Sequence, residues 1–283
     1  MTTTGKTDGD KIHRSVSRRC RIHFVVVFLA YCCLAVGSVH AAAVVDSLLE
    51  NSRVFNDFST STLTVTNNYP SRAVIDDRNL VDDGMGGSFA NRHDLIFSSD
   101  GGFTATTFDI NDVFTVQVEV KLDVGSNSPR KEAGIRFNSS VTGDALFLVN
   151  SDAGEIAAFG GGTPFKSFGS NNTGNGYTPG STILMGIIYH GDTTPRTSTY
   201  FIDRDPSTPG GIETSGAQQW TNLENGPVTF TVGFYAQVSP AGDTDFVTAT
   251  FSNISIPEPS TGILLGCAGA LFITRSRQRR RTV

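Results

Sequence analysis

The stretch Val113-Phe-Thr-Val-Gln-Val-Glu-Val-Lys-Leu122 decides the fold. Apolar residues occupy every second position from Phe114 to Leu122, and the positions between them carry threonine, glutamine, glutamate and lysine. Successive side chains of a β-strand point to opposite faces of the sheet. The stretch therefore predicts a strand with one buried face and one solvated face.

The same two-residue alternation recurs at 228–238 and in the second half of 246–256. Shorter stretches rich in Val, Ile, Thr and Phe are further strand candidates, at 63–66, 103–108, 133–138, 145–150, 155–159, 182–190 and 196–203. Turn-forming residues separate several of them, and Asp152-Ala-Gly154 and Gly191-Asp192 are tight hairpin signals. No repeat of fixed period is visible, which disfavours a solenoid or a propeller. About ten such strands predict an all-β fold, a two-sheet antiparallel sandwich of the jelly-roll type.

The N-terminal segment has the order of a secretory signal peptide. Residues 1–21 are polar and basic, an apolar run follows at 24–36, and small residues come next. Val39 and Ala41 suit the −3 and −1 positions of a cleavage site, and Ala41 with Ala43 is an equally acceptable pair. The alternatives are a short buried helix or a membrane anchor, but the 13-residue apolar run is shorter than the ~18 residues of a usual span. We expect residues 1–41 to be removed by signal peptidase after passage through the Sec translocon.

The C-terminal segment combines a helix-breaking motif, an apolar run and a basic cluster. The motif is Pro257-Glu258-Pro259, and the apolar run covers 262–274. The basic cluster consists of Arg275, Arg277, Arg279, Arg280 and Arg281. Arginines of this kind stay in the cytoplasm and stop transfer of the chain through the membrane. The apolar run would reach only ~20 Å as a helix, which suits a transient anchor better than a permanent tail anchor, the alternative interpretation.

This tail resembles the PEP-CTERM sorting signal in all three parts and in their order. The resemblance implies recognition of Pro257, Glu258 and Pro259 by an exosortase, a membrane cysteine protease of bacteria that removes the hydrophobic tail. It covers about 27 residues of the 283 and concerns destination rather than activity. We therefore expect an exported protein of the bacterial cell envelope, surface or extracellular matrix, transiently anchored by its C-terminal helix.

Processing at both ends would leave roughly residues 42–259, with the sandwich at 42–256. All four cysteines, Cys20, Cys32, Cys33 and Cys267, lie in the segments that would be removed, so thiol catalysis, thiolate metal sites and disulfides are excluded from the mature part. That part carries 11 Lys and Arg against 25 Asp and Glu, a net charge of −14. Such a field repels phosphate backbones, which excludes nucleic acid as a partner.

The middle of the chain is similar in pattern to concanavalin-like and laminin-G-like jelly rolls. The similarity rests on the strand at 113–122, on Ala133-Gly-Ile-Arg-Phe137 and Ala145-Leu-Phe-Leu-Val149 after it, and on the closing Phe251-Ser-Asn-Ile-Ser-Ile256. In those folds the successive middle strands build one concave sheet. The resemblance implies a fold and assigns no function.

Catalytic patterns are missing from the sequence. Retaining glycosidases need two carboxyl groups ~5–5.5 Å apart, as from Glu-x-Asp-x-Glu on one strand, and no such run occurs. Glu119 and Asp123 flank a lysine on the polar face of 113–122 and are interpreted as solvated. No Gly-x-Ser-x-Gly elbow is present, and only His93 and His190 remain after processing. A catalytic site assembled across the two sheets stays open as the alternative.

Two weaker hypotheses concern ligands. Hard cations prefer carboxylate-rich loops, so calcium is the candidate metal for Asp76, Asp77, Asp82, Asp83, Asp243 and Asp245. Solvated acidic loops on an acidic protein are the favoured explanation of these residues. Trp220 has polar neighbours and Tyr177 lies in an Asn/Gly-rich loop, so either ring could stack on a sugar, or pack in the core instead.

The sequence thus predicts a non-catalytic extracellular sandwich with a structural, adhesive or glycan-binding role. An extracellular polysaccharide is the expected partner. The rival hypothesis is a polysaccharide-cleaving enzyme, a glycosidase or a lyase, on the same fold.

Overall fold

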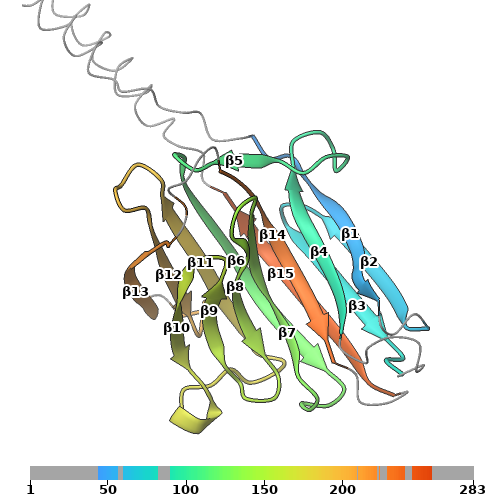
Figure 1. Cartoon of the computed structure of the whole chain (residues 1–283). Helices are drawn as coiled ribbons and strands as arrows, with labels where there is room; N and C mark the ends of the chain where they lie inside the picture. The colour runs from blue at the N-terminus through green and yellow to red at the C-terminus, as the bar shows by residue number, and fades with distance from the viewer. Residues whose placement is uncertain are drawn as a thin grey trace, which may run out of the picture. The chain divides into compact units, whose positions relative to one another are not determined.

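The computed structural model describes residues 44–56, 60–81, 90–208, 210–221, 223, 228–239 and 244–256. These residues form two antiparallel sheets packed face to face (Figure 1). Sheet A runs in the order β1 (Ser47–Asn56), β4 (Asn91–Ser98), β14 (Thr229–Val238), β7 (Lys131–Ser139), β8 (Gly143–Asn150), β9 (Ile156–Gly160) and β10 (Thr163–Gly169), with β5 (Thr107–Asp109) beside β14. Sheet B runs in the order β13 (Ile212–Gln219), β12 (Thr197–Asp203), β11 (Thr182–His190), β6 (Val113–Val124), β15 (Phe246–Ser255), β3 (Arg72–Arg78) and β2 (Thr62–Asn68). The predicted two-sheet antiparallel sandwich is confirmed.

Strand β6 shows why these residues form a sandwich. Its apolar residues Phe114, Val118 and Leu122 are buried, and the polar residues between them are only partly so. Strands β11 and β15 flank β6 in sheet B, and the apolar side chains of β6 pack in one core with those of sheet A. Each buried side chain of this size contributes about 1.5–3 kcal/mol of transfer free energy. Among the described residues, the core cluster includes side chains from Leu48 in β1 to Ile254 in β15, and both sheets contribute to it.

The sequence prediction differs from the structure in two respects. The strand at 113–122 was expected to share one sheet with the strands that follow it, but β6 belongs to sheet B, whereas β7, β8 and β9 belong to sheet A. The chain crosses from one sheet to the other between Val124 and Lys131. Strands β1, β3, β4, β10 and β13 were not predicted. The two hairpin signals are confirmed, since Asp152-Ala-Gly154 joins β8 to β9 and Gly191-Asp192 follows β11.

The first and the last strand residues of the sandwich, in β1 and β15, lie at the same end of the two sheets. Ser47 pairs with Ser98 at the end of β4, and β5, which precedes β6, pairs with the first residues of β14 at this level. Strand β15 runs antiparallel to β6 and therefore finishes near the start of β6. Among the described residues no helix is long and apolar enough to cross a membrane. The predicted signal peptide and sorting tail, including Val39, Ala41, Ala43, Pro257, Glu258, Pro259 and the five arginines, lie outside the described residues.

Candidate functional site

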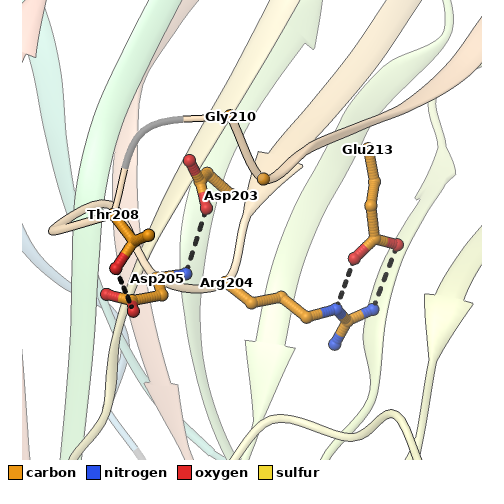
Figure 2. A pocket seen from close by; sticks show the side chains of 7 residues that line it. Asp203, Arg204, Asp205, Thr208, Gly210 and Glu213 are labelled. Atoms are coloured by element: carbon orange, nitrogen blue, oxygen red, sulfur yellow. Dashed lines mark hydrogen bonds and ion pairs between the residues drawn. The ribbon is translucent and has the colours of Figure 1, made fainter.

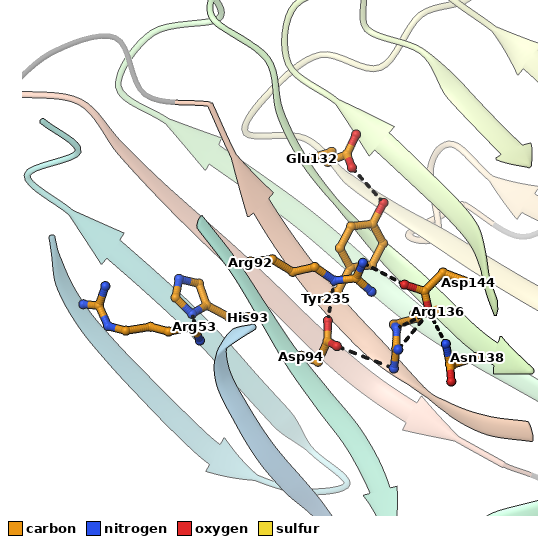
Figure 3. A network of polar contacts seen from close by, with 9 residues as sticks. All are labelled: Arg53, Arg92, His93, Asp94, Glu132, Arg136, Asn138, Asp144 and Tyr235. Atoms are coloured by element: carbon orange, nitrogen blue, oxygen red, sulfur yellow. Dashed lines mark hydrogen bonds and ion pairs between the residues drawn. The ribbon is translucent and has the colours of Figure 1, made fainter. Parts of the chain in front are cut away.

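The outer face of sheet A carries a dense group of charged side chains. In β4, Leu95 and Phe97 point into the core, so the alternating residues Arg92 and Asp94 point outward. The registers of β14, β7 and β8 place further polar residues on the same face beside them. We call this group the outer-face network, and it consists of Arg92, Asp94, Glu132, Arg136, Asn138, Asp144 and Tyr235 (Figure 3).

Two arginines and two aspartates form a closed ring of alternating charges in the network. Arg92 Nε donates to Asp94 Oδ1 at 2.9 Å, and Arg92 Nη1 donates to Asp144 Oδ2 at 2.9 Å. Arg136 Nη2 lies 2.8 Å from Asp144 Oδ1, and Arg136 Nη1 lies 3.5 Å from Asp94 Oδ2. Asn138 adds an amide donor to Asp144 Oδ1 at 2.6 Å. Planar guanidinium and carboxylate groups held by several such bonds have little conformational freedom left.

Tyr235 forms the floor of the network. The guanidinium of Arg92 lies over its ring, with the carbon Cζ 5.2 Å from the centroid, and its hydroxyl donates to Glu132 Oε1 at 3.2 Å. Burial raises the pKa of the Tyr235 phenol well above 10, and the Glu132 charge adds to this effect. The phenol therefore keeps its proton at neutral pH.

The pKa values of the two aspartates of the ring are shifted in opposite directions. Burial raises the pKa of Asp94, and the charges of Arg92 and Arg136 offset this only in part. Burial also acts to raise the pKa of Asp144, but the charge of Arg92, the Asn138 amide and Arg136 outweigh it, so the net pKa is lowered. The difference follows from exposure, because the Asp94 side chain is 1% exposed and that of Asp144 is 30% exposed.

The network is not fully satisfied. Arg92 Nη2 and Asp94 Oδ2 are buried and have no hydrogen-bond partner among the described residues. A buried polar group left without such a bond costs about 1–3 kcal/mol. The accessible part of the network is the side formed by Arg136, Asn138 and Asp144, whereas Tyr235 is fully buried.

A second polar cluster lies between the sheets and is closed to solvent. His93 Nδ1 accepts the backbone N–H of Arg53 at 3.0 Å, so its Nε2 carries the proton and donates to Asp77 Oδ2 at 3.0 Å. Asn91 also donates to Asp77 Oδ2, at 3.1 Å. This cluster joins β4 of sheet A to β3 of sheet B. Both His93 and Asp77 are almost completely buried, so the cluster is a link between the sheets rather than a binding site.

Of the six residues predicted as calcium ligands, the three that the structure describes have separate partners. Asp76 accepts from Arg78 and Thr248, Asp77 bonds to His93, and Asp245 pairs with Lys131. Asp82, Asp83 and Asp243 lie outside the described residues. Within the described part of the chain no three His, Cys, Asp or Glu side chains are grouped to hold a metal ion.

The two candidate stacking residues are buried, so of the two alternatives for these rings the structure shows packing in the core. Trp220 is 3% exposed and Tyr177 is 2% exposed, so neither presents a ring face to a ligand. Trp220 Nε1 donates to Ser198 Oγ at 2.7 Å, and the Tyr177 hydroxyl accepts the Leu122 N–H at 2.8 Å. Each polar tip finds a partner inside the molecule, which is what allows the whole ring to be buried.

A pocket of about 460 Å³ lies at the turn between β12 and β13 (Figure 2). Its lining residues are Asp203, Arg204, Asp205, Thr208, Gly210, Gly211 and Glu213. Arg204 donates to Glu213 Oε1 at 2.5 Å and to the carbonyl oxygen of Asn175 at 2.7 Å. Asp205 accepts from the hydroxyls of Ser207 and Thr208. Because its polar groups mainly bond one another, the pocket is a weaker candidate than the outer-face network.

Sequence reasoning missed every member of the outer-face network. The available signal was the pair of opposite charges at Arg92 and Asp94 immediately before the apolar run Leu95-Ile-Phe97. Two charges on alternate residues next to a buried strand mark one face of that strand as polar and ordered. Arg136 and Asp144 carry no local signal of this kind, because the registers of β4, β14, β7 and β8 bring them to Arg92.

Comparison with known proteins finds likeness in solved structures alone. No protein-family model matches the chain, and no curated protein matches it. An alginate lyase of Polysaccharide Lyase family 7, AlgAT5, is 13% identical, with 70% of this chain and 82% of that chain covered and a TM-score of 0.44. The alginate lyase from Corynebacterium sp. is 12% identical (69% and 80% covered, TM-score 0.43). The alginate lyase from Klebsiella pneumoniae is 11% identical (71% and 85% covered, TM-score 0.45). At these identities the likeness concerns the fold of the sandwich and gives no residue of this chain a role.

Proposed function

We propose that this chain is an exported sandwich protein, sorted to the envelope or the surrounding matrix, that binds a polysaccharide on the outer face of sheet A. The observation that carries the proposal is the outer-face network. Its members Arg92 and Asp94 are buried charged groups on a face where threonine and serine would be sufficient for solvation. Taking Arg92 and Asp94 out of water costs several kcal/mol per ion before pairing, which the fold alone does not require.

The chemistry of the network fits a ligand rich in hydroxyl groups. The two guanidinium groups of the ring are matched by two carboxylates, so the ring attracts neither a cation nor an anion by net charge. Arg136 and Asn138 offer donors and Asp144 offers acceptors on the accessible side. Sugar hydroxyls both donate and accept, and a site for them needs a few fixed polar groups of both kinds.

The export and sorting parts of the proposal rest on the two ends of the sequence. The leader supports passage through the Sec translocon, and the tail supports processing by an exosortase-type protease. Mass spectrometry of the secreted protein tests this part, because an intact C-terminal arginine cluster on the mature chain would contradict it.

The binding proposal is tested by titrating the sandwich with neutral and uronate-containing polysaccharides in an affinity assay. Asp144→Asn keeps the shape of the side chain and removes the charge that joins the two arginines, so affinity should fall at least about tenfold. Lys121→Gln is the matched control, because Lys121 forms an exposed ion pair with Asp123 on the outer face of sheet B. Failure to bind any polymer, or equal affinities for Asp144→Asn and the unchanged protein, would contradict the proposal.

Cleavage of the bound polysaccharide is the second candidate function. One observation favours it, namely that the hydroxyl of Tyr235 donates a hydrogen bond directly to Glu132 Oε1 at 3.2 Å. A phenol and a carboxylate in contact are suited to transferring a proton to and from a sugar chain. Binding ranks first because Tyr235 is fully buried in the present conformation.

The two candidates give different results for one variant. If the protein is an enzyme, Tyr235→Phe should abolish the release of new chain ends while polymer affinity stays within about threefold. New reducing ends and new unsaturated ends, measured separately, would also distinguish hydrolysis from elimination. Absence of both from the unchanged protein, on polymers that it binds, would contradict the second candidate.

A further inference from the structure

Strand β2 is an open edge of the sandwich. It forms one border of sheet B, and β3 is its only strand neighbour among the described residues. The exposed residues of β2 alternate with Leu63, Val65 and Asn67, which point inward but are only half-buried because no further strand covers them. An edge of this kind presents a row of free backbone N–H and C=O groups.

The other three edges of the sandwich carry protecting features that β2 lacks. Strand β1 has an irregular register between Asn51 and Phe55, and β10 contains Pro164 and Lys166. Strand β13 has a register shift opposite Thr199 and Phe201. Bulges, prolines and lysines are the devices that keep sheet edges from pairing. Strand β2, Thr-Leu-Thr-Val-Thr-Asn-Asn, pairs with β3 in an unbroken register and contains neither charge nor proline.

We propose that β2 is the interface between two copies of this chain, which pair antiparallel across a two-fold axis at Val65. This register places Thr64 opposite Thr66 and Thr62 opposite Asn68 of the partner copy. It brings no like charges together, although the mature chain is strongly acidic overall. Val65 would meet its own copy, so the half-buried apolar side chains of the edge would be covered. Sheet B would then continue without a break through both copies.

A second observation supports the same edge. Val54 and Phe55 of β1 are 40% and 46% exposed, and Arg53 of the same strand donates to Ser61, the residue before β2. Two exposed apolar side chains therefore lie close to the start of the open strand. Neighbouring exposed apolar residues on a protein surface indicate a contact site.

The inference is tested by the molar mass of the purified protein in sedimentation and light scattering. The unchanged protein should form a dimer that dissociates on dilution. In Thr64→Lys/Thr66→Lys the two new ammonium groups would lie directly opposite each other in the pair, which should raise the dimer dissociation constant at least about tenfold. Both positions are exposed on the folded monomer, and Asp76 lies beside Thr64 on β3.

Thr214→Lys/Gln219→Lys is the matched control, since it adds the same charges at exposed positions of β13, the other edge of sheet B. The control should remain dimeric, and the thermal unfolding of both variants should match that of the unchanged protein. A monomeric unchanged protein at all concentrations would overturn the inference. So would a dimer that the β2 variant leaves intact, because association would then use another surface.

Discussion

The fully buried ion pair of Lys131 and Asp245 permits a quantitative test of how the sandwich is closed. Lys131 is 0% exposed and lies on the inward side of β7. Its Nζ donates to Asp245 Oδ2 at 2.5 Å, and to the carbonyl oxygen and Oγ of Ser126 at 3.0 Å each. Ser126 lies in the crossing from sheet B to sheet A. The pair therefore joins the crossing to the start of β15.

Removing one partner leaves the other group buried without its counter-charge, although Asp245 would keep its hydrogen bonds from Ser126 and from the Phe246 N–H. Lys131→Met and Asp245→Asn should each lower the free energy of unfolding by about 3–5 kcal/mol, which is the usual cost of breaking a buried pair. For a domain of this size that corresponds to a fall in Tm of roughly 6–20 °C. The double variant Lys131→Met/Asp245→Asn leaves no unpaired charge, so its cost should be close to that of one single variant rather than to the sum of both.

Urea and thermal unfolding can be followed by the fluorescence of Trp220, the one tryptophan of the chain, which is buried in the core. Lys121→Met is the control, because the exposed pair of Lys121 with Asp123 should contribute no more than about 1 kcal/mol. The reasoning would be refuted if Lys131→Met cost less than about 1 kcal/mol, or if the two single costs added fully in the double variant.

Three further predictions concern acid stability, titration and backbone packing. The folded-state pKa values of Asp77 and Asp245 lie below their ordinary value, so their carboxylates stabilise the fold above about pH 4. That stability is lost as the pH falls through the folded pKa. Asp77→Asn should therefore reduce the dependence of the free energy of unfolding on pH in the acid range. In a carboxyl NMR titration Asp94 should titrate above about pH 3.9 and Asp144 below it; titration in the reverse order would contradict the described network. Gly134→Ala would drive a methyl group into the carbonyl oxygen of Phe147 on the neighbouring strand and should unfold most of the protein, whereas Gly143→Ala, at φ 74° with open space around it, should cost only about 1 kcal/mol. Soluble yield and Tm of the two glycine variants check the last prediction.

The sequence predicts the strands that have one apolar face and misses those that do not. Strand β6 alternates because only its inner face meets the core, so its pattern is readable from local sequence alone. Strand β4 is buried along its whole length, with His93 in the link between the sheets and Arg92 and Asp94 in the outer-face network. Its charged residues interrupt the apolar pattern because they form ion pairs, several of them with residues of other strands, and local sequence contains no information on those partners.

The candidate site was hidden for the same reason. Arg92 and Asp144 are 52 residues apart in sequence. They meet because sheet A places their strands, β4 and β8, close together with β14 and β7 between them. The polar neighbours of Trp220 suggested an exposed ring, whereas the residue directly follows β13 and its side chain packs against Phe230 and Tyr189. The flanking polar residues in β13 are on an edge strand, and their polarity reflects that edge rather than the position of the tryptophan.

The shared location of the two ends of the sandwich determines how the molecule would stand on a surface. Residues 44 and 256 lie at the same end of the strands, so a tether at either one would attach the domain to a surface by that end. The strands would then run away from the surface, and the outer face of sheet A would stand roughly perpendicular to it. A long polymer could lie across that face without approaching the surface. Because the proposed pairing through β2 is antiparallel, the partner copy would direct its own two ends away from that surface, so a dimer would offer attachment points at opposite ends.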